Sequence, residues 1–416
     1  MLKSVIGYFL FLLVALWLCD NRDIKLSRNW KPVLYGIIFQ IFIVFALTNL
    51  PMCINALESV ASGVMKLKNA TIEGTKFVFG YLGGGDVPFE IKEGSNTFVF
   101  AFQALPTVII VGTLSAILTY LKILPFLAKI FGSIFKLVFK VKDSIGMVSA
   151  AKIFVGQLEA PLLIKHQLAS LKKSDIFIIL ALAFATTSAA VMPIYAGAIE
   201  SVCPNAMKHI ILSSVISVIS VLIVSAIAMP NDENEIDLST QKIEEEKPYG
   251  SFMGAMSKGL SDGIFVWWCI VGSLIGMIAL ITFTNYLFEL LPDFGGSPIT
   301  LQRIFGIFMY PFAWLIGIQD ADLTAVARIL GTKLVLNETI AFFDLAKAHI
   351  SADSVMKTIY AINNFGNFAC IGITVGGLTA LAPSQKCITA IAGKAFVAGL
   401  VATGLTATLM SVFFSF

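Results

Sequence analysis

Seven long runs of mostly apolar residues leave this chain few ways to fold. They cover residues 4–19, 32–50, 98–121, 176–192, 210–229, 264–291 and 388–414. A helix needs about 20 such residues to cross a bilayer. An eighth segment, 355–381, is apolar but interrupted by asparagines and glycines. We therefore expect an all-α, multi-pass membrane protein with about eight transmembrane helices and the lipid bilayer as its surroundings.

The composition excludes most other classes of protein. Only 13% of the 416 residues are charged and 57% are hydrophobic, which leaves too few charges to cover a soluble protein of this size. The net charge of +3 is too small to indicate a nucleic-acid partner. The six cysteines form no CxxC pair, and no HExxH or GxSxG motif occurs. We expect no cofactor and no enzymatic activity.

Two stretches are too charged for lipid-facing helices and too apolar for soluble loops. Residues 122–173 carry nine lysines and two acids, and residues 293–350 are apolar but repeatedly interrupted by charges. Such segments are tolerated at membrane depth only when they pack inside protein. We predict two re-entrant hairpins, at about 143–172 and 298–350.

An internal repeat links each hairpin to an interrupted helix. The sequence AAKIFVGQLEAPLLIK is followed by FATTSAAVMPIYAG, and GTKLVLNETIAFFD is followed by NNFGNFACIGITVGG. The interrupted helices are expected at about 174–200 and 354–381. Lysine and arginine concentrate in residues 22–31 and 122–173, which places both stretches in the cytoplasm. The two hairpins then enter from opposite faces, as in the inverted repeats of secondary transporters.

The predicted organisation follows from these patterns. Residues 1–95 hold scaffold helices and an interfacial segment, 96–230 the first repeat, 231–263 an acidic linker and an interfacial helix, 264–382 the second repeat, and 383–416 a C-terminal helix. Residues 4–19 resemble a signal sequence, but no small-residue cleavage site follows them, so we expect this helix to be retained.

A carboxylate occurs near the tip of each predicted hairpin, Glu159 in the first and Glu338 in the second. A charge inside the membrane costs several kcal/mol and usually marks a functional site. A polar solute crossing the bilayer needs buried polar groups that replace water. We therefore predict a solute site between the hairpins. The alternative is a structural role, with each acid paired to a nearby lysine.

Four motifs, KIFVGQLEAPLLI, FATTSAAV, GTKLVLNETIAF and NNFGNFACIGI, together resemble the concentrative nucleoside transporter family. That family shows NIFVGQTEAPLLI, FATIAGSV, GTKLVLNEFVAY and GFANFSSIGI in the same order. The resemblance covers about residues 95–380. It implies a bacterial nucleoside importer of the cytoplasmic (inner) membrane, an obligate homotrimer, and elevator-type movement of each transport domain against a scaffold.

The resemblance also implies a division of the substrate site. The nucleobase would contact the first hairpin and the residue after the first break, through Gly156, Gln157, Leu158, Glu159 and Val191. The sugar would contact the second hairpin and the second break, through Glu338, Asn367 and Cys370, with Phe365 lining the pocket. Amide and carboxylate groups provide the donors and acceptors that bases and vicinal hydroxyls require.

One departure bears on ion coupling. Sodium-coupled members have asparagine where this chain has Lys152, and an ammonium offers no oxygen ligand to Na⁺. Val155, Thr186 and Thr187 would be the remnant of a sodium site, with the Lys152 ammonium donating to their oxygens. Burial disfavours the charged form of lysine, so we expect coupling to H⁺ rather than Na⁺. Alternatively, Lys152 reaches the cytoplasmic surface, and the protein is an uncoupled facilitator or uses Na⁺ elsewhere.

Two further departures leave the substrate open. Leu158 replaces a threonine of the family and Cys370 replaces a serine, so nucleobases or other polar metabolites are alternative substrates. A membrane-embedded enzyme, with Glu159 and Glu338 as an acid–base pair, and a non-transporting relative remain as further alternatives.

Overall fold

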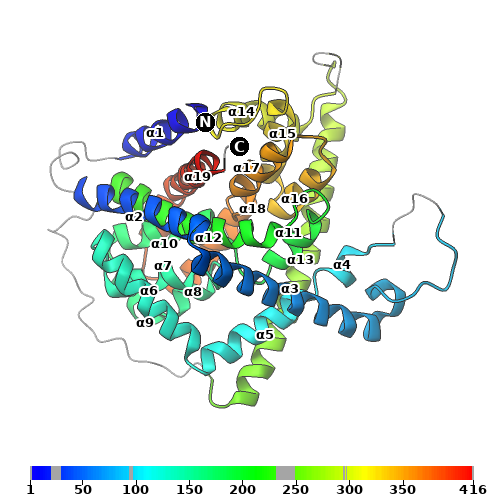
Figure 1. Ribbon diagram of the computed structural model, residues 1–416, viewed down its shortest axis with the longest axis horizontal. Helices are drawn as coiled ribbons and strands as arrows, with labels where there is room; N and C mark the ends of the chain where they lie inside the picture. Colours follow the sequence, from blue (N-terminus) through cyan, green and yellow to red (C-terminus); the bar gives the residue numbers. More distant parts are fainter. Residues whose placement is uncertain are drawn as a thin grey trace.

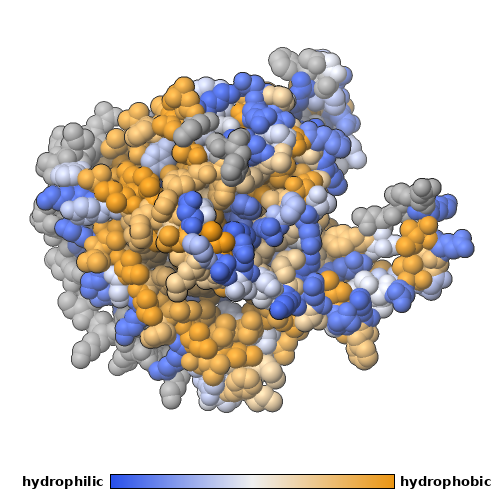
Figure 2. All heavy atoms as spheres, viewed as in Figure 1, coloured by the Kyte–Doolittle hydropathy of each residue, from blue (hydrophilic) through white to orange (hydrophobic). Residues whose placement is uncertain are grey.

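The computed structural model describes residues 2–19, 30–92, 97–230, 249–293, 296 and 298–414. These described residues form helices and no strand, which confirms the expected helical class. Residues 231–248, which make up most of the predicted acidic linker, lie outside them. Apolar side chains cover much of the face shown in Figure 2, as lipid contact requires.

Five stretches of helix in the described part of the chain are long and apolar enough to cross a membrane. They are α2 (Trp30–Asn49), α4 with α5 (Phe100–Gln103 and Thr107–Tyr120), α12 (Ala206–Ala228), α13 (Phe252–Phe288) and α19 (Cys387–Phe413). Helices α1 (Leu2–Trp17) and α18 (Phe368–Leu381) are apolar but shorter. The expected figure of eight spans had also counted the interrupted helices as full crossings.

The N-terminal region continues from α2 into α3 (Pro51–Phe79) and the short η1 (Gly80–Gly83). Helix α3 begins with a proline, which is tolerated here because an N–H in the first turn of a helix has no acceptor within the helix. It ends at Gly80, whose φ of 58° strains any side chain with a Cβ. Figure 1 shows α3 and η1 reaching away from the main body.

The first repeat places a hairpin before an interrupted helix. Its elements are α5, α6 (Ile123–Phe139), α7 (Asp143–Ala151), α8 (Glu159–Leu162), α9 (Lys165–Leu168), α10 (Lys173–Ala185), α11 (Met192–Ala198) and α12. Helices α7 to α9 form the hairpin, and α10 and α11 are the two halves of the interrupted helix. Helix α6 packs along α7, and a Cβ at Gly146 would lie 2.5 Å from the Gly132 oxygen.

The second repeat has the same order of elements. They are α13, α14 (Leu301–Leu315), α15 (Leu323–Val335), α16 (Glu338–Lys347), α17 (Ala352–Ile362), α18 and α19. Helix α14 packs on α15, where a Cβ at Gly331 would lie 2.6 Å from the Gly306 nitrogen. Close glycine contacts therefore join corresponding helices in both repeats.

Two expected boundaries differ from the structure. The second hairpin consists of α15 and α16 alone, because a loop at 316–322 separates α14 from it. The predicted interfacial helix before residue 264 is instead the start of α13, which is continuous from Phe252. Both errors have one cause: apolar composition does not show where consecutive helices separate or merge.

Helices α12 and α19 form the buried centre of the molecule, and α10 packs on both. By contrast, α13 is largely exposed along one side (Figure 1) and packs mainly on α5. Small residues allow this close approach, because a Cβ at Gly263 would lie 2.6 Å from Ile109 Cα. The α5–α13 pair is thus set apart from the helices that carry the two breaks.

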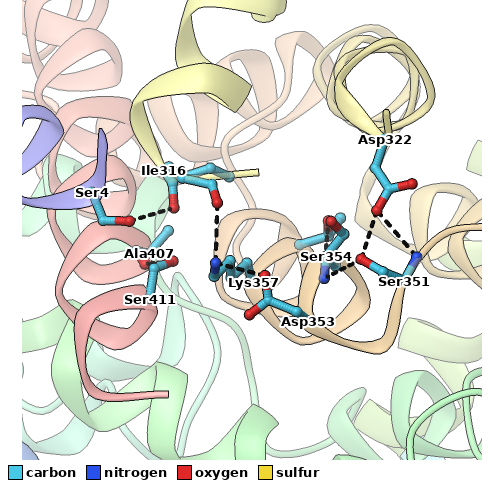
Figure 3. A network of polar contacts seen from close by, with 11 residues as sticks. Ser4, Ile316, Asp322, Ser351, Asp353, Ser354, Lys357, Ala407 and Ser411 are labelled. Carbon is cyan, nitrogen blue, oxygen red and sulfur yellow. Dashed lines mark hydrogen bonds and ion pairs between the residues drawn. The ribbon is translucent and has the colours of Figure 1, made fainter. Parts of the chain in front are cut away.

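Polar contacts fix the start of α17 against the loop that precedes α15 (Figure 3). Asp322 accepts hydrogen bonds from the backbone N–H of Ser351 at 3.1 Å and from its hydroxyl at 2.6 Å. The buried ammonium of Lys357 donates to the Gly317 carbonyl at 3.0 Å and pairs with Asp353 at 2.7 Å. The hairpin and the interrupted helix of the second repeat are therefore held together at this end.

Candidate functional site

The two helix breaks contact each other. Helix α10 ends at Ala185 and α17 ends at Ile362, and each leaves backbone groups without helical partners. The Phe365 N–H donates to the Thr186 carbonyl at 3.3 Å, and the Thr187 hydroxyl donates to Asn363 Oδ1 at 3.2 Å. The predicted pairing of two interrupted helices thus brings their polar centres together.

Lys333, in the second hairpin, donates hydrogen bonds to acceptors in the second break. It lies in the last turn of α15 and is only 3% exposed. Its ammonium donates to Asn364 Oδ1 and, at 2.6 Å, to the Gly366 carbonyl. Charges interrupt this segment of the sequence, but no role was predicted for Lys333. The signal was its position, since GTK in the second repeat matches AAK in the first.

The residues expected to hold the sugar lie together. Glu338, at the start of α16, is 5% exposed. Asn367 Nδ2 donates to Glu338 Oε2 at 3.1 Å, and Asn367 Oδ1 accepts from the Cys370 N–H at 2.9 Å as the N-cap of α18. Cys370 is also buried. A carboxylate and an amide are therefore fixed side by side at the second break.

Glu338 has a partner that the sequence analysis missed. The hydroxyl of Tyr195, on α11 in the first repeat, donates to Glu338 Oε1 at 2.7 Å. Tyr195 lies in the motif MPIY, where an aromatic residue in apolar surroundings reads as ordinary core. No signal in the sequence connects it to an acid 143 positions away.

The first hairpin tip contacts α18. Gln157 Oε1 accepts a hydrogen bond from the Thr374 hydroxyl at 3.3 Å, and the Leu158 side chain packs so closely on Gly377 that a Cβ there would lie 2.4 Å from it. The Gly156 N–H donates to Glu159 Oε2 at 3.0 Å, which closes the tip. Val191, predicted to contact the base, is buried next to the start of α11. These contacts bring the first hairpin to the helix that Asn367 caps.

The two acids differ in burial. Glu338 is buried as expected, but Glu159 is exposed. The expectation that both carboxylates are buried is therefore wrong for Glu159, because α8 is only one turn long and leaves the tip open. Neither acid forms an ion pair with a lysine in the described part of the chain. The charges of Lys152 and Lys333 nevertheless act on Glu159 and Glu338 respectively through space, so the alternative of a structural role for the two acids stays a prediction.

Lys152 is fully enclosed. It follows α7 and is 1% exposed, so the alternative in which it reaches the cytoplasmic surface is wrong. Its Nζ lies 5.7 Å from the centroid of the Phe365 ring. Nζ has no hydrogen-bond partner among the described residues, so the predicted donation to the oxygens of the sodium-site remnant is absent. Lys152 faces the second break through an aromatic ring.

Two threonines of the predicted sodium-site remnant are buried and hydrogen-bonded within the protein. The Thr186 hydroxyl donates to the Leu182 carbonyl at 2.8 Å and the Thr187 hydroxyl donates to Asn363, so both oxygens keep lone pairs. The family's side-chain oxygen ligand is replaced by the Lys152 ammonium, which repels a cation. Among the described residues no group of three or more His, Cys, Asp or Glu side chains gathers as a metal site.

Hairpins and interrupted helices in two repeats, with buried polar groups at the breaks, are typical of secondary transporters. Three family models match the chain in order. "Na+ dependent nucleoside transporter N-terminus" matches residues 6–82, "Nucleoside recognition" matches 101–202, and "Na+ dependent nucleoside transporter C-terminus" matches 209–411. The chain belongs to this nucleoside transporter family, as the four motifs predicted.

Full-length relatives support the same assignment. An "Uncharacterized transporter" of Haemophilus influenzae is 29% identical over 423 residues, covering 99% of this chain and 97% of that protein. "Nucleoside permease NupC" of Helicobacter pylori is 26% identical over 424 residues, with coverage of 99% and 97%. Human "Solute carrier family 28 member 3" is 28% identical over 426 residues, and the chain spans only 59% of its length. These relatives are transporters, in agreement with the expected absence of enzymatic activity.

Solved structures confirm the fold. "Structure of CNTnw in an inward-facing substrate-bound state" matches with a TM-score of 0.88 at 24% identity, covering 100% of this chain and 98% of that one. A variant of CNTnw in an outward-facing state matches with a TM-score of 0.86 at 23% identity. The same arrangement of helices thus occurs in structures described as facing opposite ways.

Proposed function

We propose that the protein imports nucleosides across the cytoplasmic membrane of a bacterium by alternating access. The observation that carries this proposal is the pairing of Glu338 with Asn367 at the second break. A carboxylate and an amide held this close suit the vicinal hydroxyls of a sugar, which both donate and accept. Both groups are buried, so a ligand there exchanges hydrogen bonds with protein instead of water.

The base-binding role falls to the first hairpin tip. Gln157 contacts Thr374, seven residues after Asn367 on the helix that Asn367 caps, or about 10 Å along the axis. That separation suits a base joined to a sugar. Gly156, Leu158, Glu159 and Val191 complete the base side, and Phe365 and Cys370 complete the sugar side.

The chemistry of Lys152 supports transport without Na⁺. The side chain of Lys152 occupies the place of a neutral oxygen ligand in the family motif and is buried, and an ammonium offers no oxygen to Na⁺. Proton exchange at Lys152 is the coupling we infer, and uncoupled facilitation is the alternative. Uptake of labelled uridine into proteoliposomes under imposed gradients distinguishes proton coupling from uncoupled facilitation. With proton coupling, a pH gradient drives accumulation of uridine, whereas a Na⁺ gradient has no effect. Stimulation by Na⁺ alone contradicts this role for Lys152.

The packing of α5 with α13 supports an elevator in a homotrimer. These helices join through small residues and leave most of α13 exposed, as a fixed scaffold with subunit contacts would. The two re-entrant hairpins and the interrupted helices would move together against it. Cross-linking and mass measurement in detergent should give three copies; a monomer at all protein concentrations contradicts the assembly.

Substitution of the central carboxylate tests the function itself. Glu338→Gln keeps the size of the side chain but removes its charge, so it should abolish uridine uptake while the protein elutes normally from gel filtration. Normal uptake by Glu338→Gln refutes the site.

A second candidate is transport of free nucleobases or other polar metabolites. Two observations favour it: the Leu158 side chain, packed on Gly377, offers no hydroxyl near the base, and the thiol of the buried Cys370 is a weak partner for a sugar. A competition panel of nucleosides, nucleobases and sugars distinguishes them. Inhibition by bases alone supports the second candidate.

A further inference from the structure

We propose that Tyr195 is a positioning residue that holds Glu338 for the hydroxyl groups of the substrate, and so sets selectivity for the sugar. This inference rests on the proposed function, because it assigns a residue to the same site. Tyr195 lies on α11 in the first repeat, whereas Glu338 begins α16 in the second. Their hydrogen bond therefore joins the first interrupted helix to the second hairpin.

Packing holds the ring of Tyr195 independently of the hydrogen bond to Glu338. Tyr195 is 1% exposed, and its ring stacks on Phe342 with centroids 4.6 Å apart and planes 14° apart. Phe342 lies four residues after Glu338 on α16, on the same face of the helix. The stack therefore aligns the hydroxyl with the carboxylate.

Glu338 is held from two sides and keeps free acceptor capacity. Tyr195 donates to Oε1 at 2.7 Å and Asn367 donates to Oε2 at 3.1 Å. A carboxylate has about four acceptor positions, so two directions remain for hydroxyl groups of a ligand. Because the donors come from opposite repeats, the orientation of the carboxylate is set before a substrate arrives, which lowers the cost of binding.

A purely structural role makes a different prediction. A buried tyrosine hydroxyl needs an acceptor wherever it lies, and Tyr8 provides the comparison. Its hydroxyl donates to Gln40 Oε1 at 2.9 Å between α1 and α2, away from both hairpins. If the bond to Glu338 only gives the buried Tyr195 hydroxyl an acceptor, removing that hydroxyl should weaken the binding of every ligand equally. If Tyr195 positions Glu338, the loss of binding affinity should be larger for ligands with more sugar hydroxyls.

The test is calorimetric binding of uridine, 2′-deoxyuridine and 2′,3′-dideoxyuridine to the purified full-length protein. Tyr195→Phe keeps the stack on Phe342 and removes only the hydroxyl. We expect uridine binding to weaken about tenfold, as loss of one hydrogen bond to a charged group implies. Dideoxyuridine binding should weaken less than about twofold, on the same reasoning. Tyr8→Phe should change neither affinity.

The outcomes separate this inference from the proposed function. If the unmodified protein binds none of the three ligands, the proposed function fails and the inference fails with it. If it binds uridine best and Tyr195→Phe weakens all three equally, or none, only the positioning role is overturned. Phe342→Leu provides a second variant should Tyr195→Phe misfold. It leaves the hydroxyl but removes its support, and it should reduce uridine binding more than dideoxyuridine binding; an equal reduction overturns the role.

Discussion

Two buried lysines at matching positions of the repeat should respond in opposite ways to the same substitution. Lys152→Met and Lys333→Met each remove an ammonium while keeping most of the side-chain volume. Lys333 Nζ donates to Asn364 Oδ1 and the Gly366 carbonyl, whereas Lys152 Nζ has no hydrogen-bond partner among the described residues. The difference between them is therefore one of pairing rather than of burial.

The magnitudes follow from these contacts. Removing one partner from a buried, hydrogen-bonded charge costs about 3–5 kcal/mol, so Lys333→Met should destabilise the protein by about that amount. An unpaired buried ion costs several kcal/mol, and attraction to the Phe365 ring returns at most about 2 kcal/mol. We therefore expect Lys152→Met to stabilise the protein by about 2 kcal/mol.

Thermal unfolding of both variants in the same detergent provides the measurement. For a chain of 416 residues, 2 kcal/mol corresponds to a rise in Tm of about 2 °C for Lys152→Met. Lys333→Met should lower Tm by about 3–6 °C on the same scale. A fall in Tm for Lys152→Met would refute the reasoning, because it would mean that the ammonium has a stabilising partner.

Substitutions at three other positions, one of them a control, test the stability argument. Gly331→Ala places a Cβ 2.6 Å from the Gly306 nitrogen, so it should lower the unfolding free energy by about 1–3 kcal/mol. The control is Gly393→Ala, which has no atom within 4 Å of the new Cβ and should raise the unfolding free energy by up to about 1 kcal/mol through helix propensity. Equal effects of the two variants in thermal melts would contradict the close α14–α15 contact. Ser351→Ala removes both the N-cap of α17 and the hydroxyl that donates to Asp322. It should therefore lower the unfolding free energy by about 1–2 kcal/mol. An unchanged Tm would show that the contact contributes nothing to stability.

The sequence was most informative where a motif carried both chemistry and position. GTKLVLNETIAF and NNFGNFACIGI placed Glu338 and Asn367 at a hairpin and a break, and the structure joins them by a hydrogen bond. A buried acid and a helix-capping amide are unusual enough inside apolar segments to stand out. The contact itself spans only 29 positions, within one repeat.

The misses share a physical origin. Tyr195 and Glu338 come from different repeats, so neither local periodicity nor spacing could pair them. Whether Lys152 is enclosed or reaches water depends on how α7 packs, which hydrophobicity does not determine. The exposure of Glu159 depends on the short α8, and helix length at a hairpin tip is not encoded in the motif.

The direct hydrogen bond between the two breaks limits how access to the site can change. Since the Phe365 N–H is bonded to the Thr186 carbonyl, pulling the interrupted helices apart would strand a backbone donor and acceptor away from water. The centre of the protein is therefore poorly suited to opening like a clamshell. In the elevator that we propose, the two breaks move together against the scaffold, so this hydrogen bond stays intact in both the inward-facing and the outward-facing state.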